Sequence, residues 1–328
     1  MKNISQIKQT ILGIQSEEDF NQQALDTFHF QFNHIPIYHQ FCVSLHKTNP
    51  QHYTEIPFLP ISFFKTHAIY PDTLKQPSLV FKSSGTTQSG QRSQHYITYP
   101  ELYEASFVPT FTSQIASPSN AIIFALLPNY LEQGNSSLVY MVDFLIKQTK
   151  HPLSGFYLNN YSDLLQAIQE AKQLDKEIIL FGVSYALLDL IDLQADLSGI
   201  KIIETGGMKG RRKEMTKDEL HDTLKKGLNV PHIFSEYGMT ELLSQGYLTD
   251  DTFFSSSPWL KILIRDINDP LQLIGEDKTG GVNVIDLANY YSCSFIATDD
   301  LGQIHGNQFK IMGRFDHSDI RGCNLLIG

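Results

Sequence analysis

Between residues 79 and 258 the chain alternates short, uninterrupted apolar runs with segments of helical periodicity. The runs AIIFALLP, EIILFGV and KIIET are short and have no polar alternate positions, which is typical of strands buried on both faces. Helical patterns such as LLQAIQEAKQL and YALLDLIDL follow or precede them. This order predicts an α/β fold, in which helices cover both faces of a mostly parallel sheet.

Two segments flank this predicted nucleotide-binding core of residues 79–258. Residues 1–78 combine helical spacing in SEEDFNQQALDTFHFQF with the Pro-punctuated run IPFLPISFFKT, which predicts an N-terminal helical cap. Residues 259–328 contain KILIRD, GGVNVIDLA, CSFIATDDLG and FKIMGRFD, short runs joined by Gly and Asp turns. They predict a β-rich closing subdomain of antiparallel strands.

The composition excludes some classes of partner. The 328 residues carry 25 Lys and Arg against 35 Asp and Glu, and a net charge of −10 argues against a nucleic-acid partner. No apolar stretch approaches the roughly 18 residues of a membrane span, and no secretory cleavage site follows the first residues. The three cysteines include no CxxC pair and indicate reduced thiols rather than a disulfide framework or a zinc site. We therefore expect a cytoplasmic protein.

The stretch LVFKSSGTTQSGQR places a cluster of small and hydroxylated residues directly after a predicted strand. Gly85 permits a tight turn whose N–H groups bind an anion, and the neighbouring hydroxyls add further donors. The chain contains neither the lysine of a GK[ST] phosphate loop nor a GxGxxG motif. Taken alone, such a cluster is more typical of an ordinary polar loop.

Four further loops follow apolar runs and share this polar character: ETGGMKGRRKE, SEYGMTELL, ATDDLG and GRFDHSDIRGCN. Together with SSGTT they resemble, in order, the motifs of the adenylate-forming superfamily. The whole of residues 20–328 resembles more closely the LuxE-like acyl-protein synthetases, from IPFLPISFFKT through LPNYLEQGNSSLVYMVD to GRFDHSDIRGCNLL.

The resemblance implies a role for each matching residue. The β- and γ-phosphates of ATP would be held by Ser83, Ser84, Gly85, Thr86 and Thr87. The adenosine and the α-phosphate would be contacted by Gly206, Gly207, Tyr237, Gly238, Thr240, Asp300 and Arg314. In this scheme Tyr237 stacks on the adenine, Asp300 accepts the ribose hydroxyls and Glu241 ligates Mg²⁺.

The sequence departs from the superfamily pattern in two places. Gln88 stands where the superfamily has Gly in the phosphate loop. As in LuxE-like proteins, the lid domain that carries a catalytic lysine is expected to be absent after the hinge residue Asp316. Charge stabilisation must then come from other cations. The candidates are Lys209, Arg211, Arg212 and Arg92.

The resemblance also implies that the activated acyl group is transferred to a cysteine near the carboxyl terminus, and Cys323 is in that position. Arg321 would favour its thiolate, which is the nucleophilic form. The alternative is that Cys323 is a small buried residue of a closing strand. Cys42 and Cys293 lie within the apolar runs FCVSL and YSCSFI and are predicted to be core residues.

The sequence therefore predicts an ATP- and Mg²⁺-dependent ligase of the acid–thiol type, with a small carboxylic acid as substrate. The resemblance implies a fatty acid, and an acyl carrier or acyl-reductase protein as partner. His95 and Tyr96, just after the phosphate loop, are candidates for lining the site.

Two other functions remain open from the residues alone. The segment GVSYA follows a predicted strand and imitates a nucleophile elbow, which would make Ser184 the nucleophile of an α/β-hydrolase thioesterase. The chain is alternatively a non-catalytic module that binds a nucleotide or an acyl-adenylate without turnover.

Overall fold

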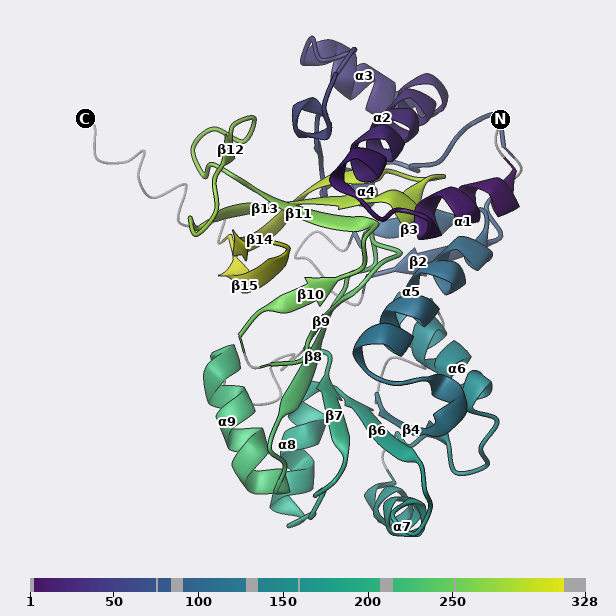
Figure 1. Cartoon of the computed structure of the whole chain (residues 1–328), viewed down its shortest axis with the longest axis vertical. Coiled ribbons are helices and arrows are strands. Elements are labelled where there is room, and N and C mark those ends of the chain that lie inside the picture. Colours follow the sequence, from purple (N-terminus) through teal and green to yellow (C-terminus); the bar gives the residue numbers. More distant parts are fainter. Residues whose placement is uncertain are drawn as a thin grey trace, which may run out of the picture.

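The computed structural model of the chain (Figure 1) describes residues 3–74, 76–83, 91–127, 135–158, 160–206, 215–250 and 252–315. Thirteen of the described strands form one sheet in the order β12-β11-β13-β14-β15-β10-β9-β8-β7-β6-β4-β5, with β1 pairing with β14 beside this path. A separate two-stranded sheet joins β2 to β3. The fold is the α/β class that the sequence predicts.

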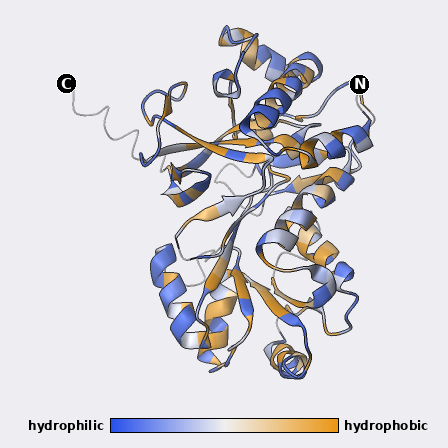
Figure 2. Cartoon of the chain, in the orientation of Figure 1, coloured by the Kyte–Doolittle hydropathy of each residue, from blue (hydrophilic) through white to orange (hydrophobic). Residues whose placement is uncertain are grey.

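The lower half of the sheet in Figure 1 is parallel. Its strands are β4 (Ala121–Leu126), β5 (Gly155–Phe156), β6 (Glu177–Gly182), β7 (Lys201–Glu204) and β8 (Ile233–Tyr237). Every residue of β4 is buried, as expected for an apolar strand covered on both faces. The apolar colour of these strands contrasts with the polar outer faces of the helices in Figure 2.

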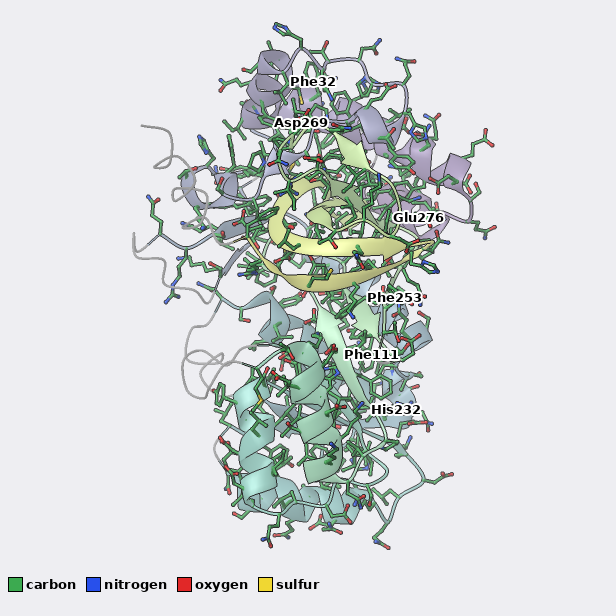
Figure 3. All side chains as sticks on the ribbon, turned by 90° about the vertical axis from the view of Figure 1, so that its left-hand side faces the viewer. Phe32, Phe111, His232, Phe253, Asp269 and Glu276 are labelled. Atoms are coloured by element: carbon green, nitrogen blue, oxygen red, sulfur yellow. The ribbon has the colours of Figure 1, made fainter. Side chains whose placement is uncertain are left out.

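Helices cover this parallel half from two sides, with α8 and α9 together on one side and α5 and α6 on the other (Figure 1). Their bounds are α5 (Pro100–Gln114), α6 (Ser137–Thr149), α7 (Tyr161–Ala171), α8 (Ser184–Asp192) and α9 (Lys217–Leu228). Phe111 of α5, labelled in Figure 3, stacks on Phe181 with ring centroids 5.9 Å apart. This contact fixes α5 against β6.

The upper half of the sheet is antiparallel and begins where β8 pairs with β9. Its strands are β9 (Gly246–Leu248), β10 (Phe254–Ser256), β11 (Leu260–Arg265), β12 (Leu273–Ile274), β13 (Gly280–Asp286), β14 (Phe295–His305) and β15 (Gln308–Arg314). The sheet continues without a break across residue 258. Strand pairing therefore does not mark a boundary there, and the division into subdomains stays a prediction.

The N-terminal helices pack on the antiparallel half. They are α1 (Ile4–Leu12), α2 (Glu17–His34), α3 (Pro36–Ser44) and α4 (Phe63–Thr66). Phe295 of β14 contacts the rings of Phe28 and Tyr38 at 6.4 and 6.1 Å. Strand β1 (Leu59–Pro60) pairs in parallel with β14, which places α4 next to the antiparallel half of the sheet.

One expectation about the SSGTT stretch is wrong. The stretch was expected to follow a strand of the parallel sheet. Instead, β2 (Leu79–Lys82) and β3 (Gln94–Ile97) form an antiparallel hairpin, in which Phe81 pairs with His95. An apolar strand followed by a glycine-containing loop suits either arrangement, so the local pattern does not distinguish them. Within the described ranges, no helix has both the length and the apolar character that a membrane crossing requires.

Candidate functional site

The candidate site is a cavity of about 540 Å³ between the parallel and antiparallel halves of the sheet. It is lined by residues from five of the polar segments singled out in the sequence. These are Ser83, Gly206, Gly238, Thr240, Glu241, Asp300 and Arg314. Residues separated by more than two hundred positions in the sequence thus meet at one cavity.

Other candidate residues lie outside the described part of the chain. They are Ser84, Gly85, Thr86, Thr87, Gly207, Lys209, Arg211, Arg212, Asp316 and Cys323. Their assigned roles remain predictions.

Ser83 is fixed at the end of the β2–β3 hairpin. Its N–H donates to the carbonyl oxygen of Ser93 at 3.1 Å, and its Oγ accepts from the N–H of Ser93 at 3.1 Å. The N–H of Lys82 donates to the carbonyl oxygen of Asn135 at 2.8 Å. These bonds hold the base of the hydroxylated loop at the cavity, where Lys82 and Ser83 both line the wall.

Asp300 of β14 is buried and is the centre of a polar cluster with Tyr237 and the more exposed Arg314. Its Oδ2 accepts from the Tyr237 hydroxyl at 2.9 Å, and its Oδ1 accepts from Arg314 Nε at 3.0 Å. Burial and the adjacent Asp300 charge raise the pKa of Tyr237 well above its usual range, so its hydroxyl remains a donor. A carboxylate has about four lone-pair positions, so Asp300 can accept further hydrogen bonds from a ligand.

Tyr237 lies beneath this cluster rather than on the cavity wall. Its ring packs against Phe309 at 5.3 Å and Phe254 at 6.0 Å, and it is 8% exposed. The hydroxyl bond to Asp300 is the contact that the structure gives it toward the site. Stacking of Tyr237 on an adenine stays a prediction.

The loop from Gly238 to Gln245, here called the Glu241 loop, is held from three sides by buried side chains. His95 Nδ1 donates to the carbonyl oxygen of Thr240 at 2.9 Å, and Asn289 Nδ2 donates to that of Glu241 at 2.7 Å. Asp286 accepts from the N–H groups of Leu243 and Ser244 at 2.7 and 2.9 Å. His95, predicted as a candidate lining residue, instead supports the loop from behind.

Glu241 projects into the cavity from this loop and is 5% exposed. Burial raises its pKa, and Ser93, Arg314 and Lys65 oppose that shift. Within the described residues no group of three His, Cys, Asp or Glu side chains gathers in a form that holds a metal. One buried carboxylate beside room for phosphates is nevertheless a suitable ligand set for Mg²⁺, which usually takes one or two carboxylates plus substrate oxygens.

Sequence reasoning missed the cation that faces Glu241. Lys65 of α4 is partly buried and lines the cavity, and its charge opposes the rise in the pKa of Glu241. It reaches the site because Leu59 pairs with Ile296 and the N–H of Ile61 donates to the carbonyl oxygen of Ala297 at 2.9 Å. The one available signal was a lysine directly after the apolar run IPFLPISFF.

The opposite side of the cavity contains two neighbouring carboxyl groups. Glu204 is 3% exposed and accepts from the Ser184 hydroxyl at 2.6 Å, the Gly206 N–H at 2.6 Å and the Ser235 hydroxyl at 3.0 Å. Its burial favours the neutral form. Contacts with His221, Lys217 and Ser184 outweigh that effect and lower the pKa of Glu204 to about 2.

Glu236 lines the cavity beside this cluster. Burial and the Glu204 charge raise its pKa to about 8, although Lys217 opposes the shift. Two carboxyl groups from adjacent strands therefore have opposite protonation states near neutral pH.

The geometry at Ser184 is not that of a nucleophile elbow. Ser184 is the first residue of α8, is 2% exposed, and donates its hydroxyl to a carboxylate. A hydrolase serine needs an exposed oxygen bonded to a histidine base. His221, the histidine of this cluster, is instead within hydrogen-bond distance of Ser235 Oγ at 3.1 Å. The thioesterase alternative therefore has no support from the described residues.

Cys42 and Cys293 are fully buried, as predicted. Burial raises the pKa of Cys42 to about 12 and that of Cys293 further. Neither thiol is in a form that reacts as a nucleophile near neutral pH.

The sequence matches no protein-family model and no curated protein sequence. Solved structures of similar fold include ATP-bound MatB from Rhodopseudomonas palustris, with a TM-score of 0.53 and 15% identity over 74% of this chain and 50% of MatB. They also include 2-hydroxyisobutyryl-CoA ligase in the postadenylation state with 2-HIB-AMP, with a TM-score of 0.65 and 10% identity over 92% of this chain and 68% of the ligase.

The luciferase-like enzyme of the Zophobas morio mealworm matches at a TM-score of 0.50 and 14% identity, over 75% of this chain and 60% of that enzyme. The chain therefore shares the fold of these enzymes. The chain spans about half the length of MatB.

Proposed function

We propose that this protein activates a carboxylic acid with ATP, as an acyl-adenylate, and then transfers the acyl group to a thiol. The observation that carries the proposal is the cavity on which Ser83, Thr240, Glu241, Asp300 and Arg314 converge. These are the residues to which the sequence resemblance assigns the nucleotide and the metal. The similarity in fold to structures solved with ATP and with an adenylate supports the same function.

The nucleotide would occupy the cavity with its ribose at Asp300 and Arg314 and its phosphates toward Ser83 and Thr240. Mg²⁺, when bound, neutralises phosphate charge and polarises the α-phosphate. Glu241 is the residue that would hold it. Lys65 and Lys82 line the same cavity and would contact the phosphates together with Lys209 and Arg211.

In the first step a carboxylate oxygen of the substrate attacks the α-phosphorus of ATP in line. A C–O–P bond forms, the bond between the α-phosphorus and the bridging oxygen breaks, and pyrophosphate leaves with that electron pair. In the second step a thiolate attacks the acyl carbonyl carbon and AMP leaves. Thioester and AMP are the products, and no oxidant or reductant is consumed.

Cys323 is the proposed acceptor thiol, as in the LuxE-like proteins, and a fatty acid is the proposed acyl group. An acyl carrier or acyl-reductase protein would receive the acyl chain afterwards. A cytoplasmic location would supply ATP and reduced thiols.

ATP–pyrophosphate exchange with a panel of carboxylic acids tests the first step without knowledge of the acceptor. We expect exchange that depends on Mg²⁺ and on one class of acid. Nucleotide binding without exchange for any acid would favour the non-catalytic module instead.

Labelling with a radioactive form of the active acid tests the second step. We expect a hydroxylamine-labile label that Cys323→Ser abolishes while exchange continues. A label that persists in that variant, or that maps to Cys42 or Cys293, would contradict acylation of Cys323.

A further inference from the structure

Behind the Glu241 loop lies a small void of about 10 Å³, lined by His95, Thr98, Leu243 and Asn289 among others. Three of these side chains bury a polar atom that has no hydrogen-bond partner within the described residues. The atoms are His95 Nε2, Thr98 Oγ1 and Asn289 Oδ1. Unpaired buried polar atoms are uncommon in native proteins because each loses its bond to water. Three of them around one void therefore indicate a bound molecule small enough to fit.

The proton positions in this group follow from its other bonds. His95 Nδ1 lies 2.9 Å from the carbonyl oxygen of Thr240, which only accepts, so Nδ1 carries the proton. Burial lowers the pKa of His95 to about 4, so the ring is neutral and Nε2 is a bare acceptor. The void thus presents an acceptor from β3.

Asn289 presents a second acceptor. Its amide nitrogen donates to the carbonyl oxygens of Glu241 at 2.7 Å and Cys293 at 3.0 Å, which fixes the orientation of the side chain and leaves Oδ1 toward the interior. Thr98 contributes a hydroxyl, which both donates and accepts.

We propose that one structural water occupies this void and joins His95, Thr98 and Asn289 into a single support for the Glu241 loop. The water donates to His95 Nε2 and Asn289 Oδ1 and accepts from the Thr98 hydroxyl. Each of the three atoms then has a hydrogen-bond partner. A void of about 10 Å³ is at the lower limit of the room that one water needs, and three partners is the usual number for a buried water.

The water would act as a positioning element. His95 and Asn289 hold the carbonyl oxygens of Thr240 and Glu241, two consecutive residues of the loop. A bridge between them keeps both side chains at one spacing, and so keeps the Glu241 carboxylate at one place in the cavity. Any effect of this positioning on the reaction rests on the proposed function, whereas the presence of the water does not.

A high-resolution crystal structure of the unmodified protein tests the site directly. We expect a density peak within about 3.2 Å of all three atoms. Density that is empty there, with the three atoms still unpaired, would overturn the proposal.

Variants test the role in positioning. Thr98→Val keeps the shape of the side chain but removes the donor, and Thr98→Ser retains it. We expect Thr98→Val to lose the density peak and to speed amide hydrogen exchange at Leu242, Leu243 and Ser244 by about tenfold, and Thr98→Ser to restore both.

Thr149→Val is the matched control, because Thr149 of α6 is also buried and donates its hydroxyl to Ile146 at 2.7 Å. It is expected to leave amide exchange in the loop unchanged. Unchanged amide hydrogen exchange in Thr98→Val would contradict the proposal that the water supports the Glu241 loop.

Pyrophosphate exchange separates this inference from the proposed function. If the proposed function holds, Thr98→Val should raise the Mg²⁺ concentration needed for half-maximal exchange, and Thr98→Ser should not. If the wild-type protein showed no pyrophosphate exchange with any acid, the proposed function would be refuted. The crystallographic density and the amide hydrogen exchange would still show whether the water is present.

Discussion

The side of the cavity formed by the Glu241 loop and the side near Glu204 and Glu236 are stabilised by different interactions. The Glu241 loop is fixed by a neutral histidine, by an amide and by a buried carboxyl group that accepts backbone N–H bonds. On the other side, Glu204 and Glu236 are neighbours whose pKa values are about 2 and about 8. Burial also raises the pKa of Glu241, and that of Asp286 to about 6, but hydrogen bonds to the backbone hold the first side in place, whereas the second side contains a carboxyl group with a pKa of about 8. We therefore expect substitutions on the two sides to differ in their effects on the Mg²⁺ requirement and on the pH dependence of stability.

The largest expected effect comes from the buried carboxyl group on the loop side. Asp286→Ala leaves the buried N–H groups of Leu243, Ser244 and Ala288 without an acceptor and should lower the free energy of unfolding by about 4 kcal/mol. Urea denaturation measures it. Asp266→Ala is the control, because this exposed carboxylate also accepts two backbone N–H bonds. Similar decreases in the free energy of unfolding of both variants would contradict the view that burial makes the Asp286 hydrogen bonds more important for stability.

A second change compares the same chemistry on the two sides. Glu241→Gln keeps the size of the side chain and removes its charge, so the Mg²⁺ needed for exchange should rise on the order of 100-fold. Glu236→Gln makes the same substitution across the cavity, where the carboxyl group already carries a proton near neutral pH, and should leave the Mg²⁺ requirement nearly unchanged. Equal effects would mean that the two sides do not differ in their relation to the metal.

The third change concerns the cation of the loop side. Lys65→Met retains most of the apolar stem, and should raise the KM for ATP about tenfold through loss of one charged hydrogen bond to phosphate. Steady-state exchange at saturating acid measures it. Lys147→Met, on an exposed side chain of α6, is the control. An unaltered KM would exclude Lys65 from contact with the nucleotide.

The smallest effect is the pH dependence of the Glu236 side. Because its pKa is raised from 4.5 to about 8, folded Glu236 retains a proton that the unfolded chain has lost, and stability falls as pH rises through this range. Glu236→Gln should remove that fall, so relative to wild type it gains about 1–2 kcal/mol between pH 7 and pH 9. Glu204, with a lowered pKa, loses its contribution only as pH falls below about 4.5, outside this window. Parallel unfolding curves for variant and wild type would contradict the raised pKa.

The sequence was sufficient to predict that some residues lie close together, because their positions follow from the order of strands and loops. Gly206 follows β7, Gly238 to Glu241 follow β8, and Asp300 lies on β14, so the segments meet at the edge where the two halves of the sheet join. Apolar periodicity and glycine-containing loops indicate this order, because each strand and each loop can be recognised from its own short stretch of sequence.

Residues that depend on distant pairing were not predictable. Lys65 reaches the cavity through β1 and β14, a contact between residues more than two hundred positions apart that no local pattern records. The raised pKa of Glu236 arises from burial beside another carboxyl group. The position of His95 behind the loop depends on its contact with Thr240, 145 positions away in the sequence. The resemblance of GVSYA to a nucleophile elbow suggested a catalytic Ser184. A strand–turn–helix pattern does not show what the serine side chain contacts.

The pairing of β1 with β14 also has a consequence for the order of events during biosynthesis. A ribosome makes Leu59 and Pro60 early, but their partners Ile296 and Ala297 emerge only after nearly the whole described chain has been made. Domains fold as contacts become available, and contacts between distant positions close late. The parallel strands and their helices can form first, whereas Lys65 cannot take its place opposite Glu241 until β14 is present. Binding of a nucleotide would therefore report that the newly made protein has completed its folding.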